Sequence, residues 1–182
     1  FTPKIISLPL LTIAPKGDDL LLAQITAALK TADLAIFVSP NAIECTMRLL
    51  ECSWQELSSN PVPIGVMGGS SMLALKNHGI GVEGNHTQII LPQNNAQWDS
   101  EGLWTELQNL RWNWSTKKVI IFKGEGGRDW LADTLKNAGA QVEAFSVYAR
   151  VPLDLNSSAW NEIHEIDFAK SLWLLTSSEA VR

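Results

Sequence analysis

Residues 34–42 have the sequence Leu-Ala-Ile-Phe-Val-Ser-Pro-Asn-Ala, and this short stretch decides the fold class. Its first five residues form a continuous apolar run, which is typical of a strand buried on both faces. Ser39 is a good N-cap and Pro40 suits the first position of a helix, so a helix is expected to follow at once. A buried strand that turns directly into a helix is the repeating unit of a parallel α/β sheet.

The same unit recurs along the chain. Apolar runs bounded by turn residues predict five strands, and the segments between them predict four helices. The strands are expected over residues 34–38, 64–67, 88–91, 118–123 and 141–148, and the helices over 42–57, 72–77, 100–110 (with Ser100 as N-cap) and 128–137. This alternation predicts an open parallel α/β sheet with right-handed crossovers, spanning about residues 10–148.

Two extended segments flank this unit, Lys4–Ile13 before it and Ser146–Leu153 at its end. The incoming and outgoing segments of an inserted domain usually run side by side. After them come an acidic stretch, 158–168, which is expected to be helical, and a run over 172–181 that repeats the pattern of 34–43. The repeat predicts two similar α/β domains. We expect a partial first domain and linker over 1–11 and 147–182, and a complete second domain over 12–146, in a segment of a longer chain.

Composition excludes several classes of protein. The 182 residues include 14 Lys and Arg against 19 Asp and Glu, a net charge of −5, with 46% hydrophobic residues. The apolar content excludes a disordered chain, and the acidic balance argues against nucleic-acid binding. No apolar run approaches the roughly 20 residues of a membrane span. Cys45 and Cys52 are expected to share one helix face, too far apart for a disulfide, which suits a reducing cytoplasm. The eight Trp residues are expected to pack in the core.

The glycine-rich turn Gly124-Glu125-Gly126-Gly127-Arg128 is the most obvious motif that could carry chemistry. A dinucleotide fingerprint would need a third glycine where Asp129 stands, so that interpretation is weak. Backbone N–H groups beside Lys123 and Arg128 suit an anion, although a tight turn with an exposed arginine explains the motif equally well.

Small hydroxyl residues recur at the strand ends, where they can cap helices or bind carboxylates. They are Ser39, Ser70, Ser71, Thr176, Ser177 and Ser178. The three histidines show no metal-ligand spacing, so neither a metal nor a cofactor is expected. Tyr148 is the only tyrosine, and its position at a domain junction fits packing as well as catalysis.

The order of these pieces resembles the uroporphyrinogen-III synthase family over nearly the whole chain. The stretches that carry the resemblance are 8–13 (LPLLTI), 36–42 (IFVSPNA), 68–71 (GGSS), 100–103 (SEGL), 121–128 (IFKGEGGR), 139–142 (GAQV), 147–150 (VYAR) and 176–181 (TSSEAV). One departure is Ser71, where the family pattern usually has threonine; the hydroxyl is kept and a methyl group is lost.

The resemblance implies two flavodoxin-like domains joined by a two-stranded linker, with substrate in the cleft between them. It also implies a lyase of haem biosynthesis that closes hydroxymethylbilane, a linear tetrapyrrole with eight carboxylates, with inversion of ring D and loss of water. Tyr148 matches the family tyrosine suspected of helping the hydroxyl to leave. Substrate contacts are expected from Ser39, Pro40, Asn41, Gly68, Ser70, Ser71, Lys123, Gly126, Gly127, Arg128, Thr176, Ser177 and Ser178. We expect a cytoplasmic monomer without cofactor, nucleic-acid or membrane partners.

Two other functions stay open from the residues alone. One is a non-catalytic module of two α/β lobes that closes on a small anion. The other is a nucleotide-dependent enzyme that uses the turn at 124–127. Because half of the expected cleft is missing, the segment by itself is expected to be inactive.

Overall fold

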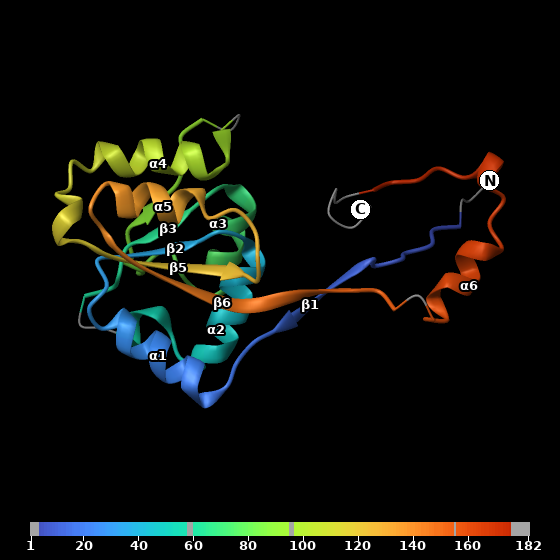
Figure 1. Cartoon of the computed structure of the whole chain (residues 1–182), viewed down its shortest axis with the longest axis horizontal. Coiled ribbons are helices and arrows are strands. Elements are labelled where there is room, and N and C mark those ends of the chain that lie inside the picture. The colour runs from blue at the N-terminus through green and yellow to red at the C-terminus, as the bar shows by residue number, and fades with distance from the viewer. Residues whose placement is uncertain (1–3, 58–59, 95–96, 155, 176–182) are drawn as a thin grey trace. The chain divides into compact units, whose positions relative to one another are not determined.

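The computed structural model describes residues 4–57, 60–94, 97–154 and 156–175 (Figure 1). The chain divides into two compact units. Pro15–Ala149 form the first of them, called here the central unit. Phe1–Ala14 and Arg150–Arg182 form the second, called the terminal unit.

A six-stranded, mostly parallel sheet is the frame of the fold. Its order is β1-β6-β5-β2-β3-β4, and the pairs from β6 to β4 are all parallel. The strands are β1 (Leu11–Pro15), β2 (Leu34–Phe37), β3 (Ile64–Val66), β4 (Ile89–Ile90), β5 (Lys118–Gly124) and β6 (Gln141–Pro152). The five predicted strands and the mixed α/β class are therefore confirmed, with β4 shorter than expected and β6 longer.

β1 and β6 pair in antiparallel fashion. In the terminal unit Leu153 N–H donates to the Leu10 carbonyl at 2.9 Å, and in the central unit Lys16 N–H donates to the Val147 carbonyl at 2.8 Å. The residue numbers of the two partners run in opposite directions, which defines an antiparallel pair. The expectation that the incoming and outgoing segments lie side by side is confirmed.

Helices cover both faces of the sheet in the central unit (Figure 1). α1 (Asp19–Leu29), α2 (Pro40–Leu50) and α3 (Gly69–Asn77) lie on one face, and α4 (Ser100–Asn109) and α5 (Trp130–Asn137) on the other. Leu103 and Leu107 of α4 and Leu131 and Leu135 of α5 pack on the strands in one buried cluster. The two helical layers give the sheet its two buried faces, as the continuous apolar strands require.

The sequence reading missed α1 and misplaced the end of α2. α1 begins after Asp18, whose carboxylate accepts from Leu21 N–H at 2.7 Å. α2 was predicted to reach residue 57, but it ends at Leu50 because Glu51 takes the left-handed conformation, with φ 52°. The chain then turns so that Trp54 enters the core in a short 3₁₀ helix, η1 (Trp54–Glu56), and its Nε1–H donates to the Val62 carbonyl at 3.0 Å.

The prediction that Cys45 and Cys52 share a helix face is wrong for the same reason. Cys45 is buried in α2, whereas Cys52 lies beyond the helix end and is exposed. Burial raises the pKa of the Cys45 thiol, and partial desolvation together with the negative charge of Glu56 raises that of Cys52.

The N-caps and first residues of four helices can be compared with those predicted from the sequence. Ser39 caps α2 as expected, since its Oγ accepts from Ala42 N–H at 3.2 Å. α4 is capped by Asp99 rather than by Ser100, because the Asp99 carboxylate accepts from Gly102 N–H at 2.7 Å. α3 begins earlier than predicted, at Gly69, and α5 begins later, at Trp130.

The terminal unit carries short elements. They are α6 (Ala159–His164) and the 3₁₀ helix η4 (Phe168–Lys170), in place of one helix over 158–168. The strand predicted at 172–175 is wrong: these residues form no strand, and the Leu172 and Leu174 side chains are exposed. A strand needs a neighbour for its backbone groups, and these residues pair with none of the described strands. Residues 176–181 of the predicted repeat lie outside the described residues.

Within the part of the chain that the structure describes, no helix is long and apolar enough to cross a membrane.

Candidate functional site

The carboxyl ends of three central strands lie level with one another. Phe37 of β2 pairs with Val66 of β3 on one side and with Phe122 of β5 on the other. Each strand is followed by a turn that leads to a helix. Because the ends are level, the turns that begin at Ser39, Gly68 and Gly124 share one edge of the sheet.

β2 and β5 form the topological switch point of this sheet. The chain leaves β2 toward α2 on one face, and it leaves the adjacent β5 toward α5 on the other face. In open α/β sheets, ligands bind in the crevice outside the strand ends at such a point. The edge between Ser39 and the 124–128 loop is therefore the candidate site.

Tyr148 fills this crevice from the neighbouring strand. It pairs with Gly124 across β5 and β6, and its hydroxyl lies 3.1 Å from Ser39 Oγ at the end of β2. The ring thus passes over β5 at Gly124. A Cβ atom at Gly124 would lie 2.6 Å from two ring carbons of Tyr148, so only glycine allows this crossing. The Tyr148 side chain is 1% exposed.

The hydrogen bond between Ser39 and Tyr148 fixes a polar pair at the start of α2. Ser39 Oγ also accepts from Ala42 N–H, so its position is set by the helix cap. Tyr148 is held from its backbone as well, because its carbonyl accepts from Glu125 N–H at 2.8 Å. The tyrosine hydroxyl therefore has a defined position relative to both turns.

The glycine-rich loop adopts a conformation that its glycines permit. Gly126 and Gly127 have φ angles of 66° and 85°, in the left-handed region that side chains disfavour. A Cβ atom added at either position would have no other group within 4 Å, so glycine is required there by the backbone conformation and not by lack of space.

Three cations at this edge each contact an acidic side chain of the same chain. Arg128 Nη2 lies 2.6 Å from Glu101 Oε1 of α4, and Lys123 contacts Asp129. Lys16, at the start of the central unit, contacts Glu125. The hydrogen bond and charge of Lys123 lower the pKa of Asp129, whose side chain is 63% exposed. The edge therefore combines cationic side chains with counter-ions that a ligand could replace.

The remaining predicted residues are placed as follows. Pro40 and Asn41 are in the first turn of α2, and Gly68, Ser70 and Ser71 are at the start of α3. Ser71 is only 3% exposed. Thr176, Ser177 and Ser178 lie outside the described residues.

The sequence reasoning missed four residues of this edge: Lys16, Gly124 as the crossing point of the Tyr148 ring, Glu101 as the partner of Arg128, and Trp98 beside the 68–69 turn. Lys16 could have been noticed as the cation that follows the incoming segment. The other three carried no local signal.

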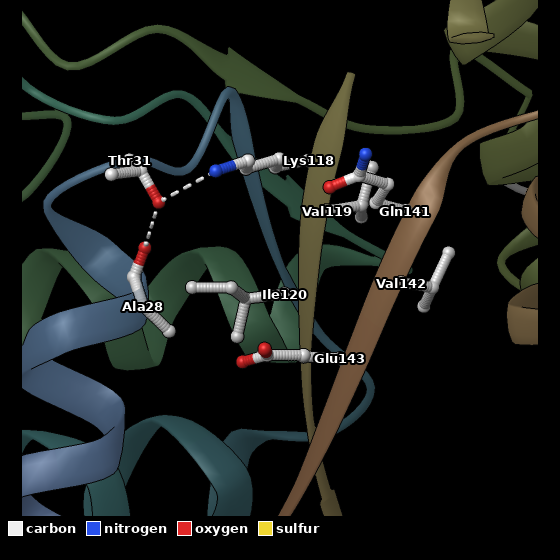
Figure 2. A pocket seen from close by; sticks show the side chains of 8 residues that line it. All are labelled: Ala28, Thr31, Lys118, Val119, Ile120, Gln141, Val142 and Glu143. Atoms are coloured by element: carbon white, nitrogen blue, oxygen red, sulfur yellow. Dashed lines mark hydrogen bonds between the residues drawn. The ribbon is translucent and has the colours of Figure 1, made fainter. Parts of the chain in front are cut away.

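A separate hollow lies at the opposite edge of the sheet (Figure 2). It has a volume of about 410 Å³ and begins at Lys118 and Gln141, the first residues of β5 and β6. Thr31 closes it from the α1 side, where its hydroxyl lies 3.5 Å from Lys118 Nζ (Figure 2). None of the substrate-contact or catalytic residues predicted from the sequence lines it.

The described residues include no group of three or more His, Cys, Asp or Glu side chains that could hold a metal ion. His78 Nε2 lies 2.9 Å from Glu44 Oε2, a pair that joins α3 to α2.

Comparison with known proteins identifies the family. The model of the family described as uroporphyrinogen-III synthase HemD matches residues 3–182. Among solved structures, a mutant uroporphyrinogen III synthase from the extremely thermophilic bacterium Thermus thermophilus is 15% identical with a TM-score of 0.55, covering 80% of this chain and 52% of that one. The uroporphyrinogen-III synthetase of Helicobacter pylori 26695 is 17% identical with a TM-score of 0.55, covering 85% and 60%.

The wild-type Thermus enzyme is 14% identical with a TM-score of 0.52, covering 78% of this chain and 50% of that one. No curated protein gave a significant match. At these identities the solved structures show a shared fold, and this chain spans between half and three-fifths of their length. The family model, in contrast, matches almost every residue, and so the chain belongs to the uroporphyrinogen-III synthase family.

Proposed function

We propose that the full-length protein is a uroporphyrinogen-III synthase, which closes hydroxymethylbilane into the macrocycle with inversion of ring D and loss of water. The observation that carries this proposal is the match of the family model over residues 3–182. The local geometry supports it: a tyrosine hydroxyl, helix N-termini and cations with exchangeable counter-ions share one edge of the sheet.

Tyr148 is the proposed catalytic residue. Its hydroxyl donates a proton to the hydroxyl group that leaves the substrate, and the resulting cationic tetrapyrrole is attacked within the same molecule. Because the Tyr148 side chain is almost fully buried, contact with the substrate requires local opening at Ser39 or at the 124–127 loop. Ring closure without inversion is chemically easy, so the main task of the site is to impose a geometry on the chain.

Substrate carboxylates bind by exchange of ion-pair partners. Arg128 and Lys123 release Glu101 and Asp129 and take a substrate carboxylate in their place. Both side chains of the Arg128–Glu101 pair are exposed, and such pairs contribute little to stability, so this exchange costs little. In the other pair Asp129 is exposed, whereas the Lys123 side chain is only 15% exposed. Gly126 and Gly127 allow the backbone to approach the same group closely.

Further contacts come from the first turns of α2 and α3, through Ser39, Pro40, Asn41, Gly68, Ser70 and Ser71. Ser71 is only 3% exposed as a whole residue, so a substrate contact from it also requires local opening. Thr176, Ser177 and Ser178 are also proposed as substrate contacts, and they lie outside the described residues.

We also propose that residues 12–146 form one of two flavodoxin-like domains, and that β1 and β6 form the linker to the other. The doubly wound sheet and the switch point between β2 and β5 support a domain of this general type, while the order of the parallel strands, β4-β3-β2-β5-β6, corresponds to the 3-2-1-4-5 order of a Rossmann sheet and not to that of flavodoxin. The antiparallel pairing at Leu10 and Leu153 supports a two-stranded linker.

Product-isomer analysis tests the proposal. The full-length protein is given hydroxymethylbilane, the products are oxidised, and the type I and type III porphyrins are separated by chromatography. Predominantly type III product is the expected result, because only ring inversion produces it. Type I product at the rate of the protein-free control refutes the proposal. Tight binding of substrate without type III product would instead favour a non-catalytic module of two lobes.

A further inference from the structure

Trp98 lies at the candidate edge, outside the hydrophobic core, and has no role in the proposed chemistry. It lies in the loop between β4 and α4, and its indole covers the Gly68-Gly69 turn. A Cβ at Gly68 would lie 3.0 Å from Cγ and Cδ2 of the indole, and a Cβ at Gly69 would lie 2.8 Å from its Cη2. The ring therefore extends along both glycines, and it can approach the backbone only because neither has a side chain.

The Trp98 side chain is exposed to an unusual degree. It is 47% exposed, whereas Trp54 and Trp114 are buried and Trp104, Trp112 and Trp130 pack against the core. The expectation that the tryptophans pack in the core is thus wrong for Trp98, and also for Trp173 of the terminal unit, which is 44% exposed. Among the described residues of the central unit, Trp98 is the only Phe, Trp or Tyr residue that is exposed. The indole lies against the Gly68-Gly69 backbone, and 47% of the residue stays accessible to a ligand.

The segment that carries Trp98 is held firmly on both sides. Asp99 caps α4, and Ser100 Oγ donates to Met67 Sδ at 3.8 Å, next to the 68–69 turn. On the other side, Gly102 packs so closely on Gln97 that a Cβ there would lie 2.0 Å from the Gln97 carbonyl oxygen. The indole is therefore a preorganised surface, which lowers the entropy cost of binding a flat ring.

The position of the indole indicates what it binds. It lies at the carboxyl edge of β3, beside the first turn of α3, where backbone N–H groups favour an anion. A flat, electron-rich ring that carries a carboxylate fits both features at once.

We infer that Trp98 is a substrate-positioning residue whose indole stacks on one pyrrole ring of the tetrapyrrole while the start of α3 takes a carboxylate of that ring. This inference rests on the proposed function and adds a residue to it. Stacking acts on the bound substrate before and during closure, so its loss weakens binding more than it slows the chemical step.

The test compares Trp98→Leu with Trp98→Phe in the full-length protein. Leucine keeps an apolar contact with Gly68 and Gly69 but has no aromatic face, whereas phenylalanine keeps a smaller one. We expect Trp98→Leu to raise KM about tenfold with kcat changed less than about threefold, and Trp98→Phe to stay within about threefold of wild type in KM. Leu73→Ala, which trims an exposed apolar side chain of α3, is the matched control and is expected to leave KM unchanged.

Two results would overturn the inference: an unchanged KM in Trp98→Leu, or equal increases in the leucine and phenylalanine variants. Thermal melting of each variant shows how much of it is folded at the assay temperature. Because KM does not depend on the concentration of active enzyme, the comparison of leucine with phenylalanine holds even if leucine lowers the folded fraction. A wild-type protein that forms only type I product would refute the proposed function instead. The two failures are therefore distinguishable.

Discussion

Gly124→Ala tests whether the Tyr148 ring crosses β5 as the structure shows. The new Cβ would lie 2.6 Å from Cε2 and Cζ and 3.0 Å from Oη of Tyr148. Carbon atoms pack best at about 3.5–4.0 Å, so the overlap is about 1 Å. Overpacking of this kind costs about 1–3 kcal/mol, and the lower entropy of alanine in the unfolded chain returns about 0.5–1 kcal/mol. The expected net loss in the free energy of unfolding is about 1–2 kcal/mol.

Urea denaturation measures this loss. With a slope near 2 kcal/mol per molar urea, the midpoint is expected to fall by about 0.5–1 M. The same substitution is then made in a Tyr148→Val background, where the ring that causes the overlap is absent. If the overlap is the cause, Gly124→Ala should stabilise the protein there by about 0.5–1 kcal/mol through the lower entropy of the unfolded chain, and the double-mutant cycle should give a coupling energy of about 1–3 kcal/mol, the full cost of overpacking.

Gly126→Ala is the matched control for the cycle. Gly126 has a positive φ and no neighbour within 4 Å of a Cβ, so alanine there is strained without touching Tyr148. Its cost, on the order of 1 kcal/mol, should be the same in both backgrounds. Equal costs of Gly124→Ala with and without the tyrosine ring would refute the reasoning.

Three further predictions concern the hydroxyl, the ion pairs and acid stability. Tyr148→Phe in the full-length protein should lower kcat for type III product at least tenfold and lower stability by about 1 kcal/mol, while Thr31→Val, which removes a hydroxyl at the opposite edge, should leave kcat unchanged. A full kcat in Tyr148→Phe removes this residue from the mechanism. Glu101→Gln should lower KM several-fold and change stability by less than about 0.5 kcal/mol, because it releases Arg128 from a largely exposed pair; steady-state kinetics that show a higher KM would contradict partner exchange. Burial acts to raise the pKa of Asp33, but hydrogen bonds from Lys118 N–H and the Lys117 ammonium outweigh it and lower the pKa below its ordinary value of 3.8. The stability that Asp33 contributes is therefore present above that ordinary pKa and is lost as the pH falls through the lower, folded-state pKa, so the free energy of unfolding should fall less steeply below about pH 4 in Asp33→Asn than in wild type.

The sequence alone determined the elements whose signals are short-range. Apolar runs bounded by turn residues located all five parallel strands, and Ser39 with Pro40 located the start of α2. These signals work because burial on both faces and helix capping depend on residues within about one turn of each other. The glycine-rich turn at 124–127 was found for the same reason, since positive φ angles at Gly126 and Gly127 are a local requirement.

Tertiary structure decided the features that join distant parts of the chain. α2 ends at Leu50 because Trp54 turns into the core and bonds the Val62 carbonyl, a contact that helix periodicity does not contain. The Ser39–Tyr148 pair is separated by 109 residues in the sequence, and it exists because β6 lies beside β5 and Gly124 leaves room for the ring.

The ion-pair partners of the cations and the position of Trp98 were also decided by tertiary structure. Arg128 meets Glu101 because α4 and α5 cover the same face, and Trp98 covers Gly68 and Gly69 because β4 lies beside β3. Residue types along the chain indicate which groups can bind an anion. Strand order and register decide which of those groups meet, because contacts between remote segments are set by the topology of the sheet.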